Sequence, residues 1–125
     1  MTESGEGGAS NAVRTAEAML AAVARAESAV IDAIERVCAA LRTGRRDEAQ
    51  HLQLRLGDAS RGYLEAIRMA QARLAAFERS APDLRQRLEA QRSAFAALLK
   101  IELAVLAAVR AAAAFDGVPP LDAAA

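Results

Sequence analysis

Apolar residues recur every three or four positions along most of the chain, which is the spacing of one face of an α-helix. The first stripe consists of Val13, Ala16, Leu20, Val23, Val30, Ile34, Val37 and Leu41. It follows the heptad spacing of a coiled coil except at Glu27, where a charged residue occupies a seam position. Ser10 or Asn11 can cap the start of this helix, and Gly44 can end it. The pattern predicts a first helix over 10–43.

The same spacing continues in two further segments. Asp47 can cap a second helix over 47–79, and Glu48 beside it suits the positive end of the helix dipole. Ser80, which is followed by a proline and an acid, marks the start of a third helix over 80–115. Three rods of similar length joined by short turns predict an all-α fold. The expected architecture is an antiparallel bundle of three long helices with coiled-coil-like packing.

Composition supports this fold class and sets the limits of the domain. Alanine, the best intrinsic helix former, makes up more than a quarter of the chain, and there are only three prolines. The segment 1–9 is rich in Gly, Ser and Glu and is predicted to be a disordered tail. Two adjacent prolines in 116–125 predict a flexible tail at the other end. The expectation is one helical domain over 10–115.

Charge argues against nucleic acid as a partner and against a membrane span. The chain carries 16 basic and 16 acidic residues, without the basic segment that a nucleic-acid-binding protein usually shows. The most apolar stretch, 94–115, contains Lys100, Glu102 and Arg110, which would be costly inside a bilayer, so no membrane span is expected. The N-terminal residues lack the pattern of a signal peptide and there is only one cysteine, so a cytoplasmic location is predicted.

Candidates for chemistry are few. Glu48 and His51 match one Glu-x-x-His fragment of a di-iron bundle, but such a site needs that fragment twice and the chain has one histidine. Cys38 has no histidine in its local sequence to activate it, and it falls on the apolar stripe. No phosphate-binding glycine loop is present. The sequence therefore predicts a protein that is not an enzyme and needs no cofactor or metal.

The segment 94–115 is more apolar than one side of a three-helix bundle requires. It is interpreted either as a central helix or homodimer seam, or as a surface kept for a protein partner that docks helix-in-groove. The partner-binding candidates are Leu98, Leu99, Leu103, Leu106 and Val109.

Several stretches resemble the FlgN-type flagellar export chaperones. They are Ala-Ile-Glu-Arg-Val-Cys-Ala-Ala-Leu at 33–41, Arg-Thr-Gly at 42–44, Asp47-Glu48-Ala with Leu52, and Leu-Glu-Ala-Gln-Arg-Ser-Ala-Phe-Ala-Ala-Leu-Leu at 88–99. The resemblance covers roughly 14–112. It implies a small cytoplasmic helical chaperone for flagellum assembly and protein export. Such proteins bind the C-terminal helical segments of hook–filament junction proteins and keep them from assembling early.

Two other hypotheses fit the same pattern. A phasin-like protein would coat storage granules with an amphipathic helix, and would bind an apolar surface instead of a peptide. A structural homo-oligomeric helical bundle would bury the third helix between copies of the chain.

Overall fold

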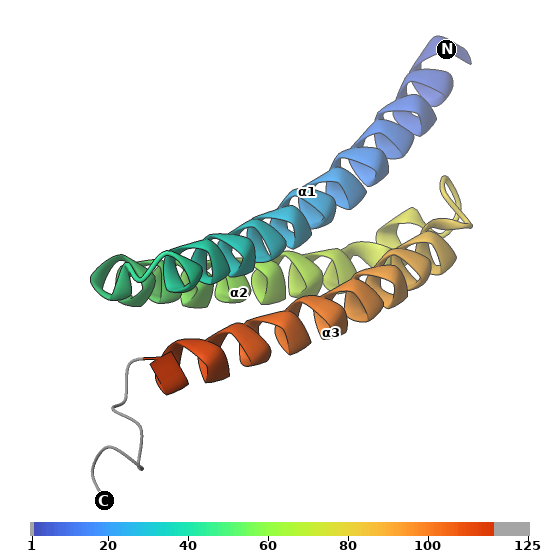
Figure 1. Cartoon of the computed structure of the whole chain (residues 1–125). Coiled ribbons are helices and arrows are strands. Elements are labelled where there is room, and N and C mark those ends of the chain that lie inside the picture. Colours follow the sequence, from blue (N-terminus) through green and yellow to red (C-terminus); the bar gives the residue numbers. More distant parts are fainter. Residues whose placement is uncertain (1, 117–125) are drawn as a thin grey trace, which may run out of the picture.

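Three long helices form the part of the chain that the computed structural model describes, residues 2–116, with side chains described from 11 to 115. They are α1 (Thr2–Arg42), α2 (Arg46–Arg73) and α3 (Leu84–Asp116), and the short 3-10 helix η1 (Leu74–Phe77) extends α2. The helices alternate in direction, so the chain runs up, down and up again (Figure 1). No strand occurs in residues 2–116. The predicted all-α bundle of three helices is confirmed.

Helix α1 lies at the centre of the bundle. The backbone of α1 packs closely against both α2 and α3, whereas within residues 2–116 the backbones of α2 and α3 do not come into close contact with each other. The side chains of Val23, Ile34 and Val37 on α1 are among the most completely buried in the described chain. The interpretation of 94–115 as the central helix is therefore wrong, because that position belongs to α1.

The start of α1 differs from the prediction. The helix begins at Thr2, ahead of the predicted start at residue 10. Asn11 does not act as a cap: its side-chain oxygen accepts a hydrogen bond from Arg14 at 3.1 Å, and its backbone carbonyl accepts one from the Thr15 hydroxyl at 2.8 Å. These are contacts of a residue inside a helix. At the other end of the chain Asp116 closes α3, and the predicted flexible tail beyond it lies outside the described residues.

The junction between α1 and α2 confirms Gly44 as the end of the first helix. Gly44 has a φ of +72°, a left-handed conformation that glycine adopts without a steric penalty. Its N–H donates to the carbonyl of Leu41 at 3.2 Å, and the next N–H, of Arg45, donates to the carbonyl of Ala40 at 2.9 Å. This pair of bonds is the Schellman motif, which satisfies the last carbonyls of a helix.

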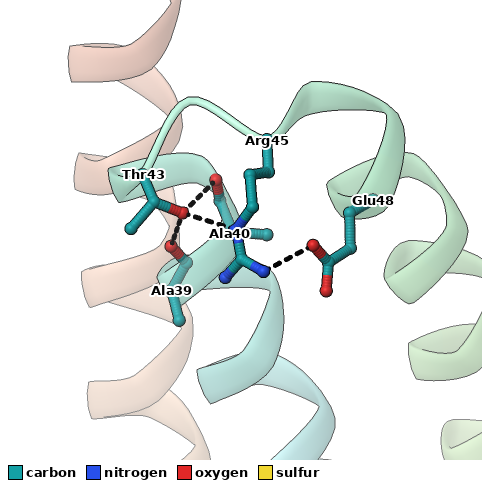
Figure 2. Close-up of polar contacts among 5 residues, drawn as sticks. All are labelled: Ala39, Ala40, Thr43, Arg45 and Glu48. Atoms are coloured by element: carbon teal, nitrogen blue, oxygen red, sulfur yellow. Dashed lines mark hydrogen bonds and ion pairs between the residues drawn. The ribbon is translucent and has the colours of Figure 1, made fainter.

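Side-chain hydrogen bonds and an ion pair also stabilise this turn (Figure 2). The Thr43 hydroxyl donates to the Ala39 carbonyl at 2.9 Å and accepts a hydrogen bond from the Arg45 Nε at 2.8 Å. The other arm of Arg45 pairs with Glu48 at 2.6 Å. Arg45 is also the N-cap residue of α2, without a side-chain cap, so Asp47 is not the cap that the sequence predicts but an acidic residue of the first turn.

The junction between α2 and α3 is longer than predicted. Residues 78–83 form turns, and α3 begins at Leu84 instead of Ser80. The backbone carbonyl of Asp83 accepts the N–H of Arg87 at 2.9 Å, which places Asp83 at the position of the N-cap. Ala81, inside the turn, is buried against the core and its N–H donates to Phe77 at 2.8 Å. Packing of this turn onto the bundle therefore delays the start of α3.

The buried apolar side chains form two core clusters, one at each end of the bundle. The first core cluster, near the α2–α3 junction, contains Ala16, Leu20, Val23, Ile67, Ala70, Leu74, Phe77, Ala81, Leu84 and Leu88. The second core cluster, near the α1–α2 junction, contains Val30, Ile34, Val37, Cys38, Phe95 and Leu106. The predicted α1 seam is buried from Ala16 to Val37 except at Glu27, while Val13 is exposed and Leu41 half-buried. Glu27 lies between the clusters, so the charge that interrupts the heptad pattern also divides the core.

Candidate protein-binding surface

Helix α3 carries more apolar side chains than the core takes up. Leu84, Leu88, Phe95 and Leu106 are buried. Between the last two, large apolar side chains remain in contact with solvent, most of all Ile101, which is 63% exposed. The exposed members are Leu98, Ile101, Leu103 and Val105. This segment is the part of the described chain where apolar surface is most concentrated on one helix.

The five predicted partner-binding residues do not form one surface. Leu106 is only 2% exposed and belongs to the second core cluster, so its assignment to a binding surface is corrected: it is a core residue. Leu99 and Val109 are half-buried and pack against the same cluster. Leu98 and Leu103 are exposed, at 44% and 45%, and they line different grooves on opposite sides of α3.

The first of these, the α2/α3 groove, has a volume of about 280 Å³. It is lined by Val30 and Ile34 of α1, Leu56, Ser60, Tyr63 and Leu64 of α2, and Phe95, Leu99 and Leu103 of α3. The Ser60 hydroxyl donates to the Leu56 carbonyl at 2.9 Å, so it makes its hydrogen bond within its own helix. The lining is otherwise almost entirely apolar.

The groove exists because α2 and α3 both pack against α1 while, within residues 2–116, their backbones do not pack closely against each other. The rings of Tyr63 and Phe95 bridge the space between α2 and α3, with centroids 4.7 Å apart and planes tilted by 46°. Leu64 and Leu103 remain uncovered on the two walls, and Leu64 is 64% exposed. A helix laid along this groove would have apolar contacts on both sides and the floor of α1 beneath it.

Leu64 is a site residue that the sequence analysis missed. It lies outside the apolar stripe that defines the buried face of α2, and a single exposed leucine is common on protein surfaces. One feature of the sequence could have pointed to Leu64. Leu54 and Leu64 are two large residues outside the apolar stripe of α2, in a helix whose other exposed positions are mostly polar.

The second groove, the α1/α3 groove, has a different chemical character and a volume of about 600 Å³. Its lining residues from α1 are Ala24, Glu27, Ser28, Ile31, Asp32 and Glu35, and those from α3 are Gln91, Ala94, Phe95 and Leu98. Three of these ten residues are acidic and none is basic. The groove therefore combines an apolar wall with a negative potential.

Glu27 is the most unusual residue of this groove. One of its carboxylate oxygens, Oε2, is buried without a hydrogen-bond partner. Burial raises the pKa of Glu27 above its ordinary value, and hydrogen bonding to Gln91 offsets part of that rise. Gln91 also donates to the backbone carbonyl of Leu20 at 3.2 Å, which fixes its amide at the α1–α3 contact.

The residues that could carry catalytic chemistry are dispersed. His51 is exposed on α2, and Cys38 is buried in the second core cluster, where burial raises the pKa of its thiol. Among the described residues, no three His, Cys, Asp or Glu side chains gather as a metal site would require. The grooves, and not these residues, are the features with the shape of a binding site.

Helix α3 also bears on the question of membranes. No helix within residues 2–116 combines the length and apolar character needed to cross a bilayer. Lys100, Glu102 and Arg110 interrupt the most apolar stretch.

The sequence matches no protein-family model, and neither curated proteins nor solved structures gave a match.

Proposed function

We propose that this protein is a non-enzymatic chaperone that holds an apolar helical segment of another protein in the α2/α3 groove. The observation that carries the proposal is the exposed pair Leu64 of α2 and Leu103 of α3, which line the same groove together with Val30 and Ile34 of α1. A large contiguous apolar patch on the surface of a monomeric protein typically marks an interaction site.

The geometry favours a helix as the occupant. With α1 packed against both α2 and α3, a fourth helix opposite α1 would complete a four-helix arrangement. Its apolar face would bury Leu64, Leu99 and Leu103 together. Full burial of a leucine contributes about 1.5–3 kcal/mol, and these three are partly buried already, so the gain for each is smaller.

The resemblance to FlgN-type export chaperones supplies the class of partner. The Gly44 turn, with Asp47 and Glu48 after it, and the long flanking helices are the features on which that resemblance rests. We therefore take the C-terminal helical segment of a hook–filament junction protein as the bound segment. In this role the chaperone would cover the segment in the cytoplasm and release it to the export machinery.

Co-expression with that segment tests the proposal, followed by gel filtration with light scattering. The wild-type chain is expected to form a stoichiometric complex. Leu103→Asp should abolish the complex, because it places a charge on the wall of the groove. Leu98→Asp is the matched control, since Leu98 is equally exposed on the other side of α3. A chain that elutes as a stable dimer without the segment would support a structural homo-oligomer instead.

A further inference from the structure

The α1/α3 groove differs from the rest of the α1–α3 contact in how its acidic residues are neutralised. Nearer the start of α1, Glu17 meets Arg87 of α3, and the Arg87 Nη2 lies 2.9 Å from the Glu17 carboxylate. That hydrogen bond lowers the pKa of Glu17. Farther along, Glu27 meets the uncharged amide of Gln91. Helix α3 thus places a cation beside Glu17 of α1 and none beside Glu27.

The remaining acids of the groove are also without a cation from α3. Asp32 pairs with Arg36 of its own helix at 3.0 Å, and both side chains are largely exposed. Glu35 has no ion-pair partner among the described residues. The nearest α3 lining residues, Ala94 and Leu98, are apolar. The groove therefore presents unpaired negative charge beside an apolar wall.

We propose that the α1/α3 groove is a second docking surface, which takes an amphipathic helix that carries a Lys or Arg within its apolar face. Charge complementarity selects this occupant: a cation opposite Glu27 or Glu35 would pair with a carboxylate that has no cation partner within the described residues. An acidic or purely apolar helix would leave the carboxylates of Glu27 and Glu35 without a cation.

The dimensions fit a short helix. The α1 residues of the lining run from Ala24 to Glu35, a span of about 16 Å at 1.5 Å per residue. Three turns of a partner helix cover this length. Ile31, which is half-buried, and Leu98, which is 44% exposed, provide the apolar contacts at its centre. A long basic side chain can pack its methylenes on Leu98 while its charged end reaches Glu27.

This surface is independent of the function proposed above, because Leu103 lines the other side of α3. A phage-displayed library of short helices, with the surface positions varied among Ala, Leu, Ser, Glu, Lys and Arg, is selected against the full-length chain. Peptides that bind the α1/α3 groove are expected to contain one or two basic residues flanked by leucines. Their affinity should fall with rising salt concentration.

Four variants locate the selected peptides. Glu27→Gln and Glu35→Gln each remove a charge with little change in shape and should weaken binding about tenfold. Leu98→Asp should abolish it, and Leu103→Asp should leave it unchanged. Circular dichroism confirms that each variant remains folded. The proposal is overturned if no peptide is enriched, if enriched peptides lack basic residues, or if the two glutamine variants bind as tightly as wild type. The proposal is also overturned if every enriched peptide is lost with Leu103→Asp and retained with Leu98→Asp, because all of them would then occupy the α2/α3 groove.

Discussion

The two halves of α3 contribute to the bundle in different ways. From Leu84 to Phe95 the large apolar side chains are all buried, and the positions between Leu84 and Leu88 are occupied by the exposed polar side chains Arg85, Gln86 and Arg87. From Leu98 to Val109 one leucine, Leu106, is buried. Apolar residues also lie on the flanks of the helix, which are the positions on either side of this buried stripe. The first half has the apolar content that its core positions need, and the second has more.

The difference shows that packing in the core does not account for all the apolar residues in the second half of α3. The buried stripe of α3 continues through both halves, from Leu88 and Phe95 to Leu106, because among the long helices of residues 2–116 it is α1 whose backbone packs closely along it. Leucines on the flanks of that stripe gain little from folding. We propose that they serve contacts outside the chain, and the variants below test that proposal, from the largest expected effect to the smallest.

Leu106→Asp should have the largest effect. It places an unpaired charge in the second core cluster and is expected to lower the free energy of unfolding by about 4 kcal/mol or more, enough to unfold a marginally stable domain. Leu84→Asp in the first half should do the same, because Leu84 is as deeply buried. Urea unfolding followed by circular dichroism measures both. A folded Leu106→Asp variant of wild-type stability would show that the second half of α3 is not held in the core.

Glu27→Gln tests the boundary between the two core clusters. Burial raises the pKa of Glu27 in the folded chain above its ordinary value, so the folded chain binds the proton more tightly than the unfolded chain does. Its contribution is fully present below the unfolded pKa and is lost as pH rises through the folded pKa. Near pH 8 the glutamine variant should therefore be more stable than wild type by about 1 kcal/mol, with the difference vanishing near pH 4. Equal stabilities throughout this pH range would show that Glu27 is solvated.

Leu103→Asp and Leu98→Asp should change stability little. Both side chains are nearly half exposed, so each substitution should alter the free energy of unfolding by about 0.5 kcal/mol. Thermal melts of the two variants, compared with Leu106→Asp, separate flank from core. Cooperative loss of structure in either flank variant would mean that its groove is closed in solution and that the residue belongs to the core.

Glu17→Gln should have the smallest effect. Glu17 and Arg87 are exposed, and the pKa of Glu17 is lowered by Arg87, so this pair contributes above the unfolded pKa and is lost as pH falls. The variant should be slightly less stable than wild type at pH 7 and equal to it in acid, a trend opposite in sign to that of Glu27→Gln. Melting temperatures measured at both pH values check the sign.

Much of the fold was predictable from local pattern. The α1 seam from Ala16 to Val37 identified the buried face, and Gly44 identified the end of the helix, because periodicity and left-handed backbone conformation are properties of short segments. Helix starts were less predictable. Asn11 and Ser80 are good caps by residue type. However, α1 begins before Asn11, and a turn with Ala81 buried in it follows Ser80 where a helix was expected.

The candidate site was predictable only in part. The apolar surplus of α3 was visible in the sequence, but the division of Leu98, Leu103 and Leu106 among two grooves and the core was not. That division depends on α1 lying between α2 and α3, which is a matter of tertiary packing. Periodicity alone cannot tell which of two neighbouring helices will cover a given flank.

The most direct test of the uncovered α2/α3 groove is the rate of thiol alkylation at Leu103→Cys in a Cys38→Ala background, with Leu106→Cys as the buried reference. The account predicts that the cysteine at position 103 reacts nearly as fast as a free thiol at every protein concentration, that the one at 106 reacts slowly, and that adding the bound helical segment protects position 103. Slow alkylation at position 103 in the chain alone, or protection that grows with protein concentration, would show that the chain covers the groove itself and would contradict the account.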